Sequence, residues 1–141
     1  MSTTGLPVFD TTVQETNLWL KALMDRLRTG DRHLAYVALR ATLHALRDRL
    51  GPENAVHLAA QLPMLLRGLY YEGWRLAASR TKERTRAEFV EHVRRELPRG
   101  VALDPELAAR AVFAVMWEKL DIGEIGKVIE LLPAELQELW R

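Results

Sequence analysis

The sequence aligns with itself without a gap when Trp19 is placed on Phe89. This register superposes residues 19–70 on residues 89–140, and ten of the 52 pairs are identical. Pro63 matches Pro133, and proline is typical of the first turn of a helix. Seven further pairs, such as Trp19 with Phe89 and Leu43 with Phe113, are conservative exchanges at apolar positions. We therefore predict an internal duplication in which each copy folds in the same way.

The duplication sets the expected organisation of the chain. The repeats cover about residues 12–72 and 85–140, and residues 73–84 form the connection between them. A unit of this length, present only twice, is too long and too rare for an open solenoid. We therefore expect one domain over residues 1–141, with the two repeats related by a pseudo-two-fold axis. Trp74 should anchor the connection along the bundle, because a large aromatic ring normally finds burial.

Apolar residues recur at helical spacing almost everywhere, and no short run alternates in the manner of a strand. This pattern predicts an all-α bundle of about eight helices, four in each repeat. In the first repeat the helices are expected over residues 12–28, 32–50, a short segment from Pro52, and 63–72.

Polar residues mark several helix starts. Thr12 with Glu15, and Thr85 with Glu88, have the spacing of a capping box, in which each side chain bonds the other residue's backbone N–H. The same reasoning predicts further helix starts at Asp31, Asp104 and Asp121.

Composition excludes several classes of protein. The chain has no cysteine, so disulfides and cysteine-ligated metals are absent. Its net charge is +1, and the basic stretch 75–99 has few interleaved aromatic residues, so we do not expect nucleic acid as a partner. The longest apolar run, residues 111–117, is too short to span a membrane, and the N-terminus lacks the pattern of an export signal. A cytoplasmic location is expected.

No motif marks an enzyme or a cofactor site. The two serines, Ser2 and Ser79, stand outside any nucleophile motif, and the glycines form no phosphate-binding pattern. No catalytic residue is therefore assigned, and no cofactor is expected.

Two pairs of residues have a spacing that could place two metal ligands on one helix face. They are Glu53 with His57 and Glu88 with His92, each four residues apart. Neither has the spacing of a di-iron helix motif. Exposed helix faces explain both pairs, so no metal site is expected.

The candidate binding residues cluster at the end of the first repeat. Arg67, Tyr70, Tyr71 and Trp74 lie three to seven residues apart, so one continuous helix would place a guanidinium and three rings on one side. Such a surface could clamp a planar anion, or the rings could cement the two repeats, with Arg67 paired to an acid such as Glu72.

Arg40 is the fifth candidate, and it matches Arg110 in the second repeat. Each arginine precedes an acid by eight residues, Asp48 and Glu118 respectively. Two buried ion pairs are one interpretation. A central anion site made of both arginines is the other, because a guanidinium can bind phosphate or carboxylate through two hydrogen bonds.

The stretch from Gln61 to Trp74 (QLPMLLRGLYYEGW) resembles the signature of the prokaryotic family of domains of unknown function DUF2267. The stretches 40–50 and 110–115 resemble that family as well. The resemblance implies a cytoplasmic, all-helical protein and brings no activity, ligand or catalytic residue with it.

Two functions remain open. The first is a non-enzymatic interaction or scaffold domain, alone or as a homodimer, that meets a protein partner through Arg67, Tyr70, Tyr71 and Trp74. The second is a binding or sensor protein that holds a planar anionic ligand between the repeats near Arg40, Arg67, Tyr70 and Trp74.

Overall fold

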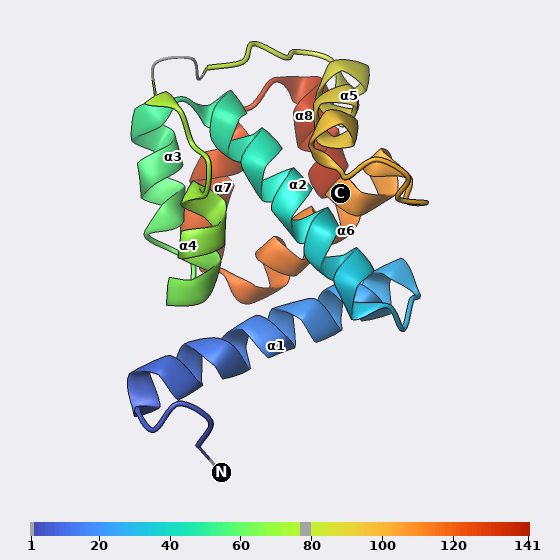
Figure 1. The fold of residues 1–141 in the computed structure, drawn as a ribbon. Helices are drawn as coiled ribbons and strands as arrows, with labels where there is room; N and C mark the ends of the chain where they lie inside the picture. The colour runs from blue at the N-terminus through green and yellow to red at the C-terminus, as the bar shows by residue number, and fades with distance from the viewer. Residues whose placement is uncertain (1, 77–79) are drawn as a thin grey trace.

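A computed structural model describes residues 2–76 and 80–141, and this part of the chain contains helices and no strand (Figure 1). The all-α prediction is confirmed. The described helices are α1 (Pro7–Leu27), α2 (Arg32–Leu50), α3 (Pro52–Ala59), α4 (Met64–Tyr71), α5 (Arg86–Glu96), α6 (Pro105–Lys119), α7 (Ile122–Glu130), α8 (Ala134–Gln137) and the closing 3-10 helix η2 (Glu138–Trp140).

Most predicted helix starts are confirmed at atomic detail. The Asp31 side chain accepts hydrogen bonds from the first backbone N–H groups of α2, and Asp104 does the same for α6. Thr85 and Glu88 form both bonds of the predicted capping box at α5. Asp121 precedes α7 as predicted, although its side chain makes no capping bond.

The predicted start of the first helix at Thr12 is wrong. Helix α1 begins five residues earlier at Pro7, whose fixed φ suits a first turn. Thr12 lies inside the helix and is buried, and its hydroxyl accepts a hydrogen bond of 2.9 Å from the backbone N–H of Leu65. The hydroxyl therefore ties α1 to the start of α4 instead of capping its own helix.

Helix α2 is the centre of the molecule. It packs against α1, α3, α4, α5 and α6, and residues on nearly all of its sides are buried. One hydrophobic core extends from Trp19 in α1 to Leu139 near the C-terminus. The helices before and after the connection therefore share this core.

The connection lies along α2, as predicted. Trp74 is partly buried against the core, and the backbone N–H of Thr81 donates to the carbonyl oxygen of Asp48 at 3.1 Å. From α2, the Arg49 guanidinium donates to the carbonyl oxygen of Glu83 at 2.7 Å. Residues 77–79 of the predicted connection lie outside the described residues.

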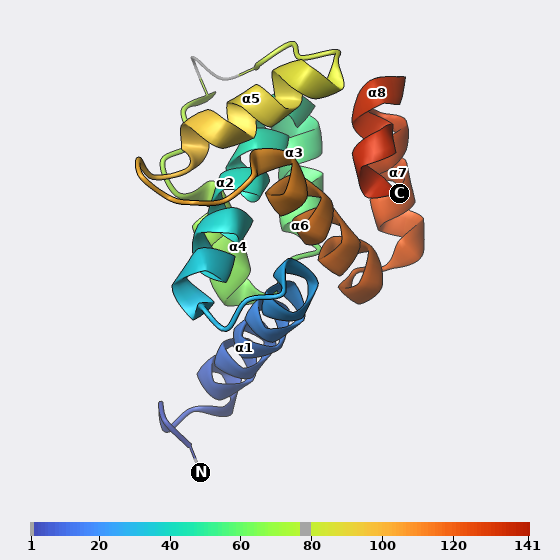
Figure 2. The same cartoon turned by 90° about the vertical axis from the view of Figure 1, so that its right-hand side faces the viewer.

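The N-terminal end of α1 projects beyond the other helices (Figures 1 and 2). Helix α1 packs against α2, α4 and α6, and its N-terminal end reaches beyond them. None of the described helices has the length and apolar character needed to cross a membrane.

Candidate functional site

Arg67, Tyr70, Tyr71 and Trp74, which were predicted to lie on one side of a continuous helix, do not share one helical face. Helix α4 ends at Tyr71, so Trp74 lies beyond it in the connection. Glu72 is the helix C-cap, and Gly73 follows with a positive φ of 72°, a conformation that glycine adopts readily. The chain therefore turns away before Trp74 can continue the helical row.

Tyr70 is part of the core. Its side chain is completely buried, and its hydroxyl donates to the carbonyl oxygen of Ala55 at 2.8 Å. Burial strongly raises the pKa of its phenol. Tyr71 and Trp74 are partly exposed, and their rings stack with centroids 5.6 Å apart.

Arg67 bonds to backbone and not to Glu72. Its Nε donates to the carbonyl oxygen of Ala59 at 3.1 Å, and Nη2 donates to that of Leu62 at 3.0 Å. These carbonyls belong to the end of α3 and the turn after it, where helical partners run out. The predicted pairing of Arg67 with Glu72 is wrong, because the guanidinium satisfies these carbonyls.

We expect Arg67→Ala to lower the free energy of unfolding by about 1 kcal/mol, since two hydrogen bonds to backbone carbonyls disappear. Arg67→Gln should retain most of the stability, because an amide can still reach the carbonyl of Leu62. Gln137 makes the corresponding bond in the second half of the chain, to Leu132 at 2.9 Å. Urea denaturation followed by circular dichroism would measure both variants. An unchanged midpoint for Arg67→Ala would show that Arg67 is available for a ligand.

Arg40 and Arg110 also have partners other than those predicted. Arg40 Nε contacts Glu72 at 3.1 Å, and Arg110 Nε contacts Glu106 at 3.0 Å. Both arginines are part-exposed, so these are surface ion pairs of modest strength. Asp48 pairs instead with its neighbour Arg47.

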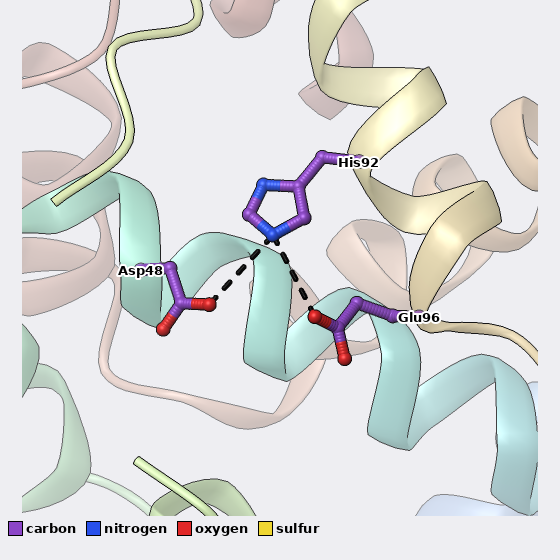
Figure 3. A group of neighbouring side chains, drawn as sticks. All are labelled: Asp48, His92 and Glu96. Carbon is purple, nitrogen blue, oxygen red and sulfur yellow. Dashed lines mark ion pairs between the residues drawn. The ribbon is translucent and has the colours of Figure 1, made fainter. Parts of the chain in front are cut away.

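The densest group of titratable side chains lies where α2 meets α5. His92 of α5 is buried, with 5% of its surface exposed. Its Nδ1 lies 2.9 Å from Glu83 Oε1, and its Nε2 lies 3.7 Å from both Asp48 Oδ2 and Glu96 Oε1. Figure 3 shows the carboxylates of Asp48 and Glu96 on the two sides of Nε2. We call Asp48, Glu83, His92 and Glu96 the seam cluster.

The positive charge of His92 and the negative charges of the three carboxylates stabilise each other. Burial lowers the pKa of His92, but the carboxylates around the ring outweigh burial and raise this pKa to about 11. Burial raises the pKa of Asp48 and of Glu83, yet hydrogen bonding and the positive charge of His92 bring both below their usual values. Contact with His92 likewise lowers the pKa of Glu96.

His44 lies on the edge of the same cluster and behaves differently. Its Nε2 is 2.8 Å from the carbonyl oxygen of Leu69, and its Nδ1 is 3.9 Å from Glu96 Oε2. Burial lowers the pKa of His44, and the charges of Arg47 and Arg40 add to this effect. His44 is therefore held neutral while His92 is held charged.

A pocket of about 280 Å³ opens beside the seam cluster. It lies between α2, α5 and the connection. Its lining combines three arginines with acids and small residues: Arg40, His44, Arg47, Asp48, Glu72, Gly73, Arg75, Thr81 and Glu96. Of the five predicted residues, Arg40 is the one that lines this pocket.

Sequence reasoning named His92 and Asp48, but paired them with Glu88 and Arg40 instead of with each other. The predicted partner Glu88 belongs to the capping box at Thr85, whereas Glu96, four residues on the other side, faces the ring. The His92–Glu96 spacing was a usable signal. Asp48 comes from α2 and Glu83 from the connection, so the packing of α2 and of the connection against α5 brings them to His92.

A second hollow of about 340 Å³ lies between α1, α2 and α4, and we call it the apolar groove. Gly68 is in its wall, and a methyl group added there would meet no other atom within 4 Å. The other residues of the lining are mostly apolar: Thr16, Leu20, Tyr36, Leu39, Leu65, Leu66, Leu69 and Glu72.

Comparison with known proteins identifies the family of the chain but gives no activity for it. No curated protein matches the chain. The model of one family, described as uncharacterized conserved proteins (DUF2267), matches residues 16–139 and so covers every helix from within α1 to η2. The predicted resemblance is confirmed, and the chain belongs to the DUF2267 family.

Proposed function

We propose that this protein is a non-enzymatic helical interaction domain that pairs with a second copy of itself through α1 and the apolar groove. One observation carries the proposal: the exposed end of α1 is apolar, and the same helix forms one wall of the apolar groove. Its proposed location is the cytoplasm, on the basis of the family resemblance.

The exposed end of α1 carries large apolar side chains. Val8 is 53% exposed and Phe9 is 44% exposed, on the part of the helix that projects from the body (Figure 2). They stand one turn before buried Thr12, on the side of the helix that continues through Thr16 into the groove. The side of α1 that packs against the body therefore continues beyond the body, and its exposed end is apolar.

A second copy would cover both features at once. In a two-fold dimer, Val8 and Phe9 of each copy would enter the apolar groove of the other, so the same surface serves as donor and acceptor. A groove of about 340 Å³ has room for a phenyl ring, and Gly68 leaves its wall open. Such a dimer would bury apolar surface that a monomer leaves in water.

The internal duplication is part of the proposal, and the packing supports it. Helix α1 contacts α6 and α2 contacts α5, which are the reciprocal contacts that a pseudo-two-fold axis requires. Helices α2 and α6 also contact each other, as do α3 and α7. Within the halves, α1 contacts α4 as α5 contacts α8.

The proposed duplication supports the groove as a candidate for function. In the second half, Arg86 lies 3.9 Å from Glu106 and 3.7 Å from Glu138, and its backbone N–H donates to Glu135. In the register of the internal alignment, these four charged residues correspond to Thr16, Tyr36, Gly68 and Leu65. The position filled by ion pairs in one half is therefore an apolar groove in the other.

The second candidate function is the binding of a planar anionic ligand in the pocket of about 280 Å³ beside the seam cluster. Arg40, Arg47 and Arg75 line this pocket, and of the residues predicted to hold such a ligand it includes Arg40 alone. Asp48 and Glu72 already neutralise Arg47 and Arg40, which weakens the attraction for an anion. We therefore rank this function below self-association.

Native mass spectrometry of the protein from its own host distinguishes the two candidates, because it reports subunit number and any retained molecule together. We expect a dimer. Phe9→Asp should weaken dimerisation at least tenfold by placing a charge in the groove, an effect of about 1.4 kcal/mol or more. Gly68→Met should have a similar effect by filling the groove.

The control is Ile122→Asp, which changes an apolar residue on α7 that is even more exposed than Phe9. This variant should dimerise normally. A monomer at high concentration, or a dimer that tolerates both groove variants, would refute the proposed interface. A monomer with a retained anion would favour the second candidate.

A further inference from the structure

We propose that Asp48, His92 and Glu96 bind a divalent transition-metal ion such as Zn²⁺. These three side chains offer one nitrogen and two carboxylate oxygens, and the three ligand atoms lie within 4.8 Å of one another. A histidine nitrogen with carboxylates is a donor set that zinc accepts, whereas calcium and magnesium favour oxygen alone. The proposal is independent of self-association.

The distances leave space for an ion between the ligands. His92 Nε2 lies 3.7 Å from each carboxylate, which is longer than a hydrogen bond. Around a zinc ion with bonds of about 2.1 Å, neighbouring ligand atoms are about 3.0 to 3.4 Å apart. Small side-chain rotations would therefore close the ligands around the ion (Figure 3).

Glu83 orients the imidazole for metal binding. Its carboxylate lies 2.9 Å from Nδ1 of His92 and also accepts a hydrogen bond of 2.9 Å from the Thr81 hydroxyl. A proton on Nδ1 that is donated to Glu83 leaves the lone pair of Nε2 directed between Asp48 and Glu96. Metal-binding histidines typically have such a carboxylate on the nitrogen away from the metal.

Solvent can reach the proposed ion from one side. Asp48 and Glu96 both line the pocket of about 280 Å³, while His92 is buried behind them. An ion could therefore enter through the pocket, and water could complete its coordination.

The related position in the other half of the chain is an ordinary ion pair. In the register of the internal alignment, Glu96 corresponds to Arg26 and Asp48 to Glu118, and these two side chains form an exposed ion pair at 3.8 Å. There an arginine balances the acid. At the seam cluster a second acid takes the place of that arginine, so the carboxylates share a positive charge between them.

A metal ion binds an imidazole nitrogen that carries no proton, so metal binding at Nε2 of His92 would release any proton held there.

Cobalt and zinc titrations of the chelator-treated, tag-free chain test the proposal. We expect one Co²⁺ per chain, with visible absorption bands typical of nitrogen and oxygen coordination, and displacement of Co²⁺ by Zn²⁺. Isothermal titration with Zn²⁺ should give the same stoichiometry. Bound Zn²⁺ should also raise the melting temperature, because the ligands come together only in the folded chain.

Variants identify the ligands. Glu96→Gln and Asp48→Asn should each weaken Zn²⁺ binding at least tenfold, and both change part-exposed side chains, so they keep the test valid if His92→Gln fails to fold. His57→Gln is the control, because it removes an exposed histidine with a glutamate four residues away. Its binding should be unchanged.

Two results would overturn the proposal. One is the absence of Zn²⁺ and Co²⁺ binding at millimolar concentration, which would leave His92 as a protonated structural residue. The other is equal binding by the wild type, Glu96→Gln and Asp48→Asn, which would place the ion elsewhere.

Discussion

His92→Gln is expected to lower the free energy of unfolding of the metal-free protein by about 3 kcal/mol near neutral pH. The imidazolium is buried among Asp48, Glu83 and Glu96, and a neutral amide would leave these carboxylates close together without the charge that balances them. The carboxylates keep some contact with water, which places the effect at the lower end for a broken buried ion pair. Urea denaturation in the presence of a chelator would measure it.

The pH dependence of this difference tests its electrostatic origin. The pKa of His92 is raised in the folded protein, so its stabilising contribution is complete below the unfolded pKa of about 6.5. The contribution declines as the pH rises from there towards about 11. The difference between wild type and His92→Gln should therefore be larger at about pH 6 than at about pH 9.

The other titratable groups near His92 affect stability with a different pH dependence, so they do not produce the same change between about pH 6 and pH 9. The pKa values of Asp48, Glu83 and Glu96 are lowered in the folded protein, so their contribution is present above the usual carboxyl range and is lost only at more acidic pH. The lowered pKa of His44 costs stability below about pH 6.5, and we expect this cost in both proteins. A difference that stays constant between about pH 6 and pH 9 would show that His92 acts by packing alone.

Tyr70→Ala is expected to have a still larger effect, a loss of about 4 kcal/mol. The ring is completely buried, so its removal leaves a cavity beside α3, and the carbonyl of Ala55 loses the donor from the hydroxyl. Tyr70→Phe keeps the ring and should lose about 1 kcal/mol for the hydrogen bond. Thermal and urea denaturation would measure both variants.

Tyr36→Ala provides the comparison, because this tyrosine is exposed at the edge of the apolar groove. It should change stability by less than about 1 kcal/mol. A Tyr70→Ala variant as stable as the wild type would mean that the ring is not part of the core, and would restore Tyr70 as a candidate binding residue.

Local signals in the sequence were reliable where the controlling contacts are local. The capping box of Thr85 and Glu88, the cap at Asp31 and the helical spacing of apolar residues each depend on atoms a few positions apart, and the structure confirms them. Thr12 is the exception, because its hydroxyl has two competing uses. Pro7 allows the helix to start earlier, and the Thr12 hydroxyl accepts a hydrogen bond from the backbone N–H of Leu65 instead of capping the helix.

The candidate site depended on contacts between distant residues. The predicted row of Arg67, Tyr70, Tyr71 and Trp74 assumed one continuous helix, but α4 ends at Tyr71 and the ring of Tyr70 points into the core. Tyr70 and Tyr71 lie three and four residues after Arg67, and both spacings fit a binding surface on one side of a helix. Only the packing of α3 against α4 distinguishes the buried ring from the part-exposed one.

The helices and their order could be predicted from the sequence, because helix formation follows from apolar spacing and caps that act within a few residues, and the family from short stretches of sequence. Which polar residues meet depends on the tertiary packing. The packing of α2 against α5 placed Asp48 beside His92, and the end of α1 beyond the body left Val8 and Phe9 in water. These arrangements depend on how far one helix extends past another and on which sides face each other, and neither is encoded in local spacing.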